Sequence, residues 1–173
     1  MKKYKKLNIG IVGLGNIGLY LYDHLQKNKK NIKEKNNVDI NIKYVSAKNR
    51  FKKRRLKIPK KKWLKNYTEI YKKKDINIIV ELIGGSEGPA KKLVFESIKN
   101  RKHVVTANKA LISKYGDELA KLAEIKKVNL EYEAAVAGGI PIIRTLKEGL
   151  IANKINKIYG ILNGTSNYIL SNM

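Results

Sequence analysis

Apolar and polar positions follow two alternating periods along the first 133 residues, and this predicts a layered α/β fold. Leu7 to Val12 is a short, almost continuous apolar run, as expected for a strand covered on both faces. Ile17, Leu21 and Leu25 then recur at helical spacing. The expected strands span 7–12, 38–47, 75–83, 103–107 and 128–134, and the expected helices run from the first turn to about residue 30 and over 68–73, 87–99 and 115–126. Connections of this length favour parallel pairing, so we expect a Rossmann-type doubly wound parallel sheet.

The connections carry their own signals. Residues 28–37 are polar and indicate a surface loop, and 48–62 form a strongly basic loop. Thr68 is a candidate N-cap for the short helix. In the helix expected over 87–99, the inward stripe is predicted to be Ala90, Leu93, Val94, Ser97 and Ile98.

The pattern of residue types changes after residue 133. A small, glycine-rich stretch is followed by a helix expected from Pro141 to about Ala152, a strand over 154–162 and a helix beginning within 163–173. We therefore expect two domains, a doubly wound α/β domain over 1–133 and an incomplete start of an α+β domain over 134–173.

The first strand runs directly into Gly13-Leu14-Gly15-Asn16-Ile17-Gly18, a G-x-G-x-x-G turn that opens a helix. Gly13 permits the tight turn, Gly15 lets the backbone approach a pyrophosphate, and Gly18 lets the helix pack close to the strand. The order of strand, turn and helix favours a dinucleotide site. The alternative is a glycine-rich turn that binds nothing.

Composition narrows the classes of function. The 173 residues carry a net charge of +24, which invites a nucleic-acid-binding interpretation. Only five of the 38 basic residues are arginine, however, and Lys, Asn, Ile and Tyr are the residues whose codons are richest in A and T. A genome rich in A and T explains this charge better than base recognition does, because proteins that recognise bases typically use arginine for bidentate contacts. The chain has no cysteine and no apolar run of membrane-spanning length, so we expect a cytoplasmic protein without membrane contact.

The basic loop bears on the choice of dinucleotide. A site that prefers NAD usually has a carboxylate at the end of the second strand, but the nearest one, Asp39, lies at the other end of that strand. Basic residues follow the strand instead and could receive a 2′-phosphate. Lys48 is the first candidate because it directly follows the strand, and Arg50 is the second. We therefore expect NADP(H) to be preferred over NAD(H), the alternative being that these are ordinary surface cations.

Four further stretches, together with the glycine turn, resemble homoserine dehydrogenase over nearly the whole chain. They are ELIGG at 81–85, HVVTANKAL at 103–111, EAAVAGGIP at 133–141 and GILNGTSNYIL at 160–170. The resemblance implies an oxidoreductase that interconverts L-homoserine and L-aspartate 4-semialdehyde with NAD(P)H, on the route to threonine, methionine and isoleucine. Two alternatives remain: another NAD(P)-dependent amino-acid or aldehyde dehydrogenase with the same nucleotide domain, and a basic nucleic-acid-binding module.

The resemblance also implies site residues. Lys109 is similar to the family's lysine beside nicotinamide and substrate, and would assist catalysis there. The expected cofactor contacts are Gly13, Leu14, Gly15, Asn16, Ile17, Gly18, Lys48, Arg50, Gly84, Gly85 and Lys109. The resemblance implies a sodium site at Glu133, Val136, Gly138 and Ile140.

In the family, the substrate carboxylates and the main acid–base lysine lie further along the chain than Met173. We therefore expect a fragment that binds NADP(H) weakly, does not turn over homoserine and exposes an apolar patch. The full-length parent is expected to be a homo-oligomer.

Overall fold

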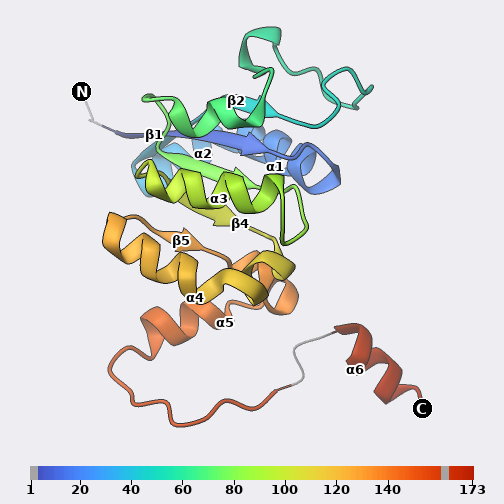
Figure 1. Ribbon diagram of the computed structural model, residues 1–173, viewed down its shortest axis with the longest axis vertical. Helices are drawn as coiled ribbons and strands as arrows, with labels where there is room; N and C mark the ends of the chain where they lie inside the picture. The colour runs from blue at the N-terminus through green and yellow to red at the C-terminus, as the bar shows by residue number, and fades with distance from the viewer. Residues whose placement is uncertain (1–3, 161–163) are drawn as a thin grey trace.

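A computed structural model describes residues 4–160 and 164–173, which contain a five-stranded parallel sheet (Figure 1). The strand order is β2-β1-β3-β4-β5, and every neighbouring pair is parallel. The strands are β1 (Lys5–Val12), β2 (Val38–Ser46), β3 (Ile78–Glu81), β4 (His103–Thr106) and β5 (Leu130–Glu131). The expected Rossmann-type doubly wound fold is confirmed.

Helices cover both faces of this sheet. In Figure 1, α1 (Asn16–Lys27) and α2 (Lys29–Asn36) lie behind it, whereas α3 (Pro89–Lys99) and α4 (Lys109–Lys126) lie in front. A 3₁₀ segment, η2 (Tyr67–Lys72), contacts α3 on the front face. The chain therefore crosses from the rear face to the front face between β1 and β3.

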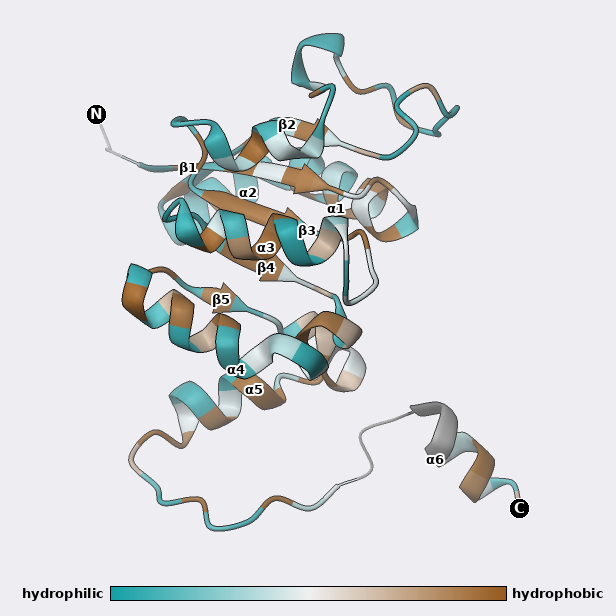
Figure 2. Cartoon of the chain, viewed as in Figure 1, coloured by the Kyte–Doolittle hydropathy of each residue, from teal (hydrophilic) through white to brown (hydrophobic). Residues whose placement is uncertain are grey.

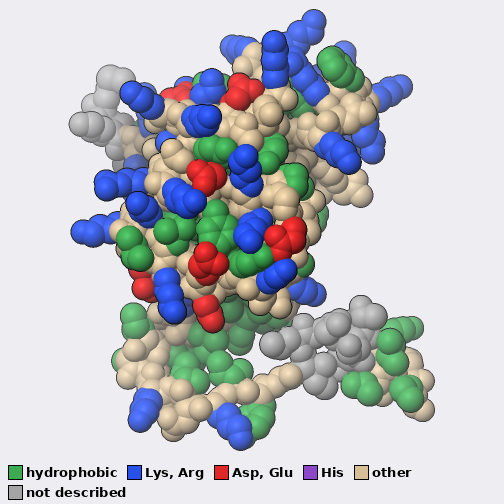
Figure 3. Space-filling model, viewed as in Figure 1, with side chains coloured by type: hydrophobic (Ala, Val, Ile, Leu, Met, Phe, Trp, Pro, Cys, Tyr) green, Lys and Arg blue, Asp and Glu red, His purple; other side chains and the backbone are tan. Residues whose placement is uncertain are grey.

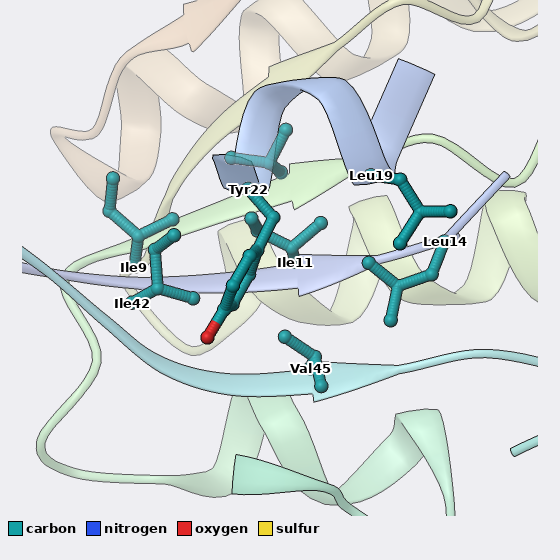
Figure 4. Close-up of a cluster of buried hydrophobic side chains, with 8 residues drawn as sticks. Ile9, Ile11, Leu14, Leu19, Tyr22, Ile42 and Val45 are labelled. Carbon is teal, nitrogen blue, oxygen red and sulfur yellow. The ribbon is translucent and has the colours of Figure 1, made fainter. Parts of the chain in front are cut away.

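The core follows from the period of two in the strands. Ile9 and Ile11 of β1 face α1 and pack with Leu19 and Tyr22 in the cluster shown in Figure 4. The next residue of β1, Val12, faces the front and packs with Ile70 of η2 in a second cluster. Figure 2 shows the apolar strands enclosed by helices whose outer faces are polar. The five residues of the inward stripe predicted for α3 are all buried.

Three local expectations are wrong. Residues 29–36 form a helix rather than a loop; α2 has no buried residue, so it carries no apolar stripe by which it could be detected. The short helix is capped by Asn66, whose side chain accepts from the Thr68 amide at 2.9 Å, so Thr68 is not the cap. Helix α4 begins at Lys109 instead of Tyr115, because Asn108 caps it by accepting from the Leu111 amide at 3.1 Å.

The segment after residue 133 differs most from expectation. Short 3₁₀ turns, η3 (Glu133–Ala135) and η4 (Ala137–Gly139), lead into α5 (Ile142–Arg144) and a π-turn, η5 (Thr145–Gly149). No strand forms over 154–160, because the extended chain there has no hydrogen-bonded neighbour; the rest of that expected strand lies outside the described residues. The final helix is confirmed as α6 (Gly164–Ser171).

Within the described residues, no helix has the length and apolar character that a bilayer crossing requires.

Candidate functional site

The carboxyl ends of β1 and β3 are the place where this sheet can receive a ligand. The two strands are neighbours, with Val12 paired to Glu81, yet the helices that follow them lie on opposite faces. Such a switch point leaves a crevice outside the strand ends, and doubly wound sheets bind their ligands there. The glycine turn and the segment after β3 both lie at this edge.

The three glycines of the turn are required for different reasons. Gly13 has φ +101°, and a Cβ there would lie 2.3 Å from the carbonyl oxygen of Leu82. A Cβ on Gly18 would lie 2.0 Å from the carbonyl oxygen of Gly13. Gly15 has an ordinary φ of −78°, and nothing lies within 4 Å of the position that its Cβ would take. Gly13 and Gly18 are therefore required for packing, whereas Gly15 leaves open space on the ligand side.

Helix α1 begins immediately after Gly15 and has no side-chain cap. Its first intrahelical bond at this end runs from the Leu19 amide to the Gly15 carbonyl at 2.9 Å. The amides before Leu19 are those that a helix start leaves for an external acceptor, and the helix dipole favours an anion there. Leu14, expected among the contacts, directs its side chain into the core, whereas the Ile17 side chain is 65% exposed.

The segment after β3 presents two glycines in the left-handed region. Gly84 has φ +86° and Gly85 φ +80°, and the space where their Cβ atoms would lie is open. The Gly85 carbonyl accepts from the side-chain amide of Asn108 at 2.7 Å. Asn108 thus ties this loop to the start of α4, where Lys109 is the first helical residue and is exposed.

Lys109 is placed where folding alone does not favour a cation. The first turn of α4 contains no acidic residue, and the positive end of a helix dipole typically disfavours a positive charge by about 0.3–1 kcal/mol. Its position at the ligand edge of the sheet is consistent with a role toward an anionic or carbonyl oxygen.

The basic loop contacts the glycine turn through Arg54, a residue that the sequence argument did not single out. The Arg54 guanidinium donates to the carbonyls of Asn49 at 2.6 Å and Lys52 at 2.9 Å, and its Nε approaches the Leu14 carbonyl at 3.5 Å. It also lies 5.0 Å from the Trp63 ring centroid. Arg54 therefore holds the loop beside the turn.

The two predicted phosphate partners belong to this loop. Lys48 is exposed and Arg50 half-buried, and within the described ranges 4–160 and 164–173 neither forms an ion pair. Asp39 pairs with Lys29 at 3.2 Å near the amino end of β2, away from the site. Burial acts to raise the pKa of Asp39, but the hydrogen bond and charge of Lys29 outweigh it and lower that pKa.

The residues expected to hold a cation lie in two consecutive 3₁₀ turns or directly after them: Glu133 in η3, Val136 after it, Gly138 in η4 and Ile140 after that. The Glu133 carboxylate accepts from the amides of Ile143 at 3.0 Å and Arg144 at 2.8 Å, and the Ile140 carbonyl accepts from Ile142 at 2.8 Å. Gly138 lies in the left-handed region, at φ +56°. A carboxylate and backbone carbonyls are ligands that suit a hard cation, so the chemistry of this set fits such an ion. The Glu133 oxygens would then contact the ion as well as the two amides.

One acidic residue at the site escaped the sequence argument. Glu81, the last residue of β3, is fully buried and accepts from the amides of Ile83 and Gly84. A single carboxylate in an otherwise apolar run, at the end of a strand expected to be buried, is a signal that could have revealed it.

A parallel doubly wound sheet with a glycine turn at its switch point is a dinucleotide-binding domain of the Rossmann type. The family comparisons agree: residues 13–133 match the homoserine dehydrogenase NAD-binding domain, and residues 141–173 match the family described as homoserine dehydrogenase. The chain therefore belongs to the homoserine dehydrogenase family, and its nucleotide domain is of the type that binds a nicotinamide cofactor.

Individual relatives cover almost all of this chain. It is 45% identical over 169 residues to a homoserine dehydrogenase of Neisseria gonorrhoeae, covering 98% of this chain and 38% of that protein. It is 37% identical to one of Bacillus subtilis, covering 39% of that protein. The crystal structure of a homoserine dehydrogenase from Thiobacillus denitrificans superposes with a TM-score of 0.85 and 41% identity, over 100% of this chain and 40% of that one. The chain spans less than half the length of these relatives.

Proposed function

We propose that this chain forms the cofactor-binding part of a homoserine dehydrogenase, which interconverts L-homoserine and L-aspartate 4-semialdehyde with NADP(H) in preference to NAD(H). One observation carries the proposal: the glycine turn, the segment Leu82–Gly85 and the start of α4 at Lys109 come together at the switch point. Two domains, divided near residue 133, are part of the same proposal.

The residues at this edge would have different roles in binding the cofactor and the substrate. The glycine turn and the amides opening α1 would bind the pyrophosphate, and the open faces of Gly84 and Gly85 would line the path toward the nicotinamide. The bound cofactor supplies the hydride. The Lys109 ammonium would hold the substrate oxygen and stabilise the negative charge that develops on it during hydride transfer.

The preference for NADP(H) is supported by charge. The basic loop held by Arg54 carries Lys48 and Arg50 beside the turn, and Asp39 is engaged elsewhere. We expect tighter binding of NADPH than of NADH in fluorescence titrations. Because a charged hydrogen bond contributes about 1.5–3 kcal/mol, Arg50→Ala should weaken NADPH binding about tenfold or more and NADH binding little.

Lys121→Ala in α4 is the matched control, since it removes one surface cation and should leave both dissociation constants unchanged. Tighter binding of NADH than of NADPH would refute the preference, and an equal loss of affinity for both cofactors in Arg50→Ala would refute Arg50 as a phosphate partner.

The Glu133 carboxylate and the nearby backbone carbonyls are of the chemical type that would hold a sodium ion with a structural role. Sodium chloride should raise the melting temperature of the wild-type chain above that in choline chloride of equal ionic strength. Glu133→Gln should lose this difference, while Glu148→Gln, in η5, should keep it. If sodium does not change the melting temperature of the wild-type chain, the proposed sodium site is refuted.

A further inference from the structure

Glu81 is a buried carboxyl group at the carboxyl end of the central strand of the sheet. It is the last residue of β3, the middle strand, and its relative exposure is 0%. Its Oε1 accepts from the amides of Ile83 at 2.7 Å and Gly84 at 3.1 Å, and its Oε2 accepts from the Thr106 hydroxyl at 2.5 Å. A buried carboxylate is unfavourable unless such donors satisfy it. All three donors are uncharged, and two of them belong to the loop that faces the proposed cofactor.

The hydrogen bonds continue beyond Thr106 and return to the same loop. The Asn108 amide donates to the Thr106 hydroxyl oxygen at 3.0 Å, while the Asn108 side chain donates to the Gly85 carbonyl at 2.7 Å and accepts from the Leu111 amide at 3.1 Å. Lys109 follows directly. The chain of bonds from Glu81 through Thr106 and Asn108 therefore joins the glycines after β3 to the first turn of α4.

Packing alone does not call for a carboxylate here. The other residues of β3 are Ile78, Ile79 and Val80, and an apolar side chain at the fourth position would fill buried space without the cost of desolvating a polar group. What an apolar residue could not do is hold two successive loop amides inward and accept a hydroxyl from the neighbouring strand. The hydrogen bonds of Glu81 hold the segment after β3 and join it to the end of β4.

We propose that Glu81 is a positioning residue of the site: acting through Thr106 and Asn108, it sets the Gly84–Gly85 loop and Lys109 in register for the nicotinamide half of the cofactor. This rests on the proposed function, since it assumes that a nicotinamide dinucleotide binds at the switch point. It goes beyond that function by assigning a role to a residue that would not touch the cofactor.

The variants at Thr106 give the sharpest test. Thr106→Val keeps the volume and the strand propensity of the side chain but deletes the hydroxyl that links Glu81 to Asn108, whereas Thr106→Ser keeps the hydroxyl. Glu81→Gln keeps the shape and can still accept from the loop amides, but it then directs its NH₂ group toward Thr106. That group can only donate to the hydroxyl oxygen, so the buried Thr106 hydroxyl loses the acceptor for its proton.

Two probes separate the halves of the cofactor. NADPH carries both halves, and adenosine 2′,5′-bisphosphate lacks the nicotinamide. Dissociation constants are measured at a temperature at which circular dichroism shows each variant fully folded. Losing the equivalent of one hydrogen bond, we expect Thr106→Val and Glu81→Gln to bind NADPH about tenfold more weakly, with unchanged binding of the bisphosphate. Thr106→Ser should bind both as the wild type does.

The outcomes distinguish the two proposals. If the folded Thr106→Val variant binds NADPH as tightly as the wild type, Glu81 has only a structural role and this inference is overturned while the proposed function stands. If Thr106→Val weakens both probes equally, the positioning is not specific to the nicotinamide half, and the inference is also overturned. If the wild type binds neither probe, the proposed function itself fails. Should Glu81→Gln not fold, the comparison of Thr106→Val with Thr106→Ser decides.

Discussion

At the scale of single residues, the glycines show how a requirement of folding can be separated from a requirement of binding. Gly13 and Gly18 lie against backbone atoms that a Cβ would overlap, so the fold itself demands them. Gly15 has neither a positive φ nor a neighbour within 4 Å. No packing reason remains for a glycine at this position, and an approaching ligand supplies one.

Glu87, in the loop between β3 and α3, gives a prediction about pH. Hydrogen bonds from Lys114, at 2.6 Å, and from Tyr115 lower the pKa of its carboxyl to about 2, well below the usual value near 4.5. A lowered pKa means that this contact stabilises the fold fully above about pH 4.5 and is lost as the pH falls toward 2. Glu87→Gln should therefore melt below the wild type at pH 6, and the difference should shrink steadily between pH 4.5 and 2.

Thermal melts at several pH values check this. Glu34→Gln in α2 is the control, because Glu34 forms no ion pair within the described part of the chain, and its effect should not change over the same range. If the melting temperatures of Glu87→Gln and the wild type differ by the same amount at pH 6 and pH 3, the contact of Glu87 with Lys114 and Tyr115 does not stabilise the fold as described.

Whether a site residue could be predicted from the sequence depends on how local its signal is. The glycine turn has a fixed spacing and directly follows a strand, and Lys109 lies in a recognisable family segment. Arg54 has no such signal for its contact with the turn, because the Leu14 carbonyl that it approaches lies 40 residues away in the sequence. The apolar run before Glu81 could reveal a buried carboxyl group, but not its contact with the Thr106 hydroxyl, 25 residues away.

At the scale of elements, amphipathic periodicity predicted the helices that pack against the sheet and missed a helix that does not. The inward stripe of α3 was predicted because burial produces it, whereas α2 buries no residue and left no stripe. The start of α4 was misplaced because its first turns lie at the ligand edge, where Lys109 and Ala110 are exposed. The strand expected over 154–162 was predicted from alternation alone, but pairing requires a neighbouring strand that residues 154–160 do not have.

At the scale of the whole molecule, the surface has two characters. Figure 3 shows basic side chains spread over the sheet domain and apolar ones gathered near the carboxyl-terminal segment. Ile151, Tyr159, Tyr168 and Leu170 are among the large apolar residues exposed there. Exposed apolar side chains that gather in one region often mark a place of interaction.

The central claim is that a dinucleotide lies against the backbone at the switch point, and Gly15 offers the most direct test. Gly15→Val adds a side chain where the protein leaves open space, with an expected cost to helix capping of about 1 kcal/mol or less. Gly116→Ala in α4 is the matched control: its Cβ would meet Ile112 at an ordinary 3.6 Å, and it should stabilise the helix by about 1 kcal/mol.

The measurement is an NADPH titration of the wild type and both variants, followed by fluorescence, with circular dichroism to confirm folding. The account predicts saturable binding by the wild type and by Gly116→Ala, and binding at least tenfold weaker in a folded Gly15→Val, because the new side chain occupies the place of the pyrophosphate. Unchanged NADPH binding by Gly15→Val, or no saturable binding by the wild type, would contradict it.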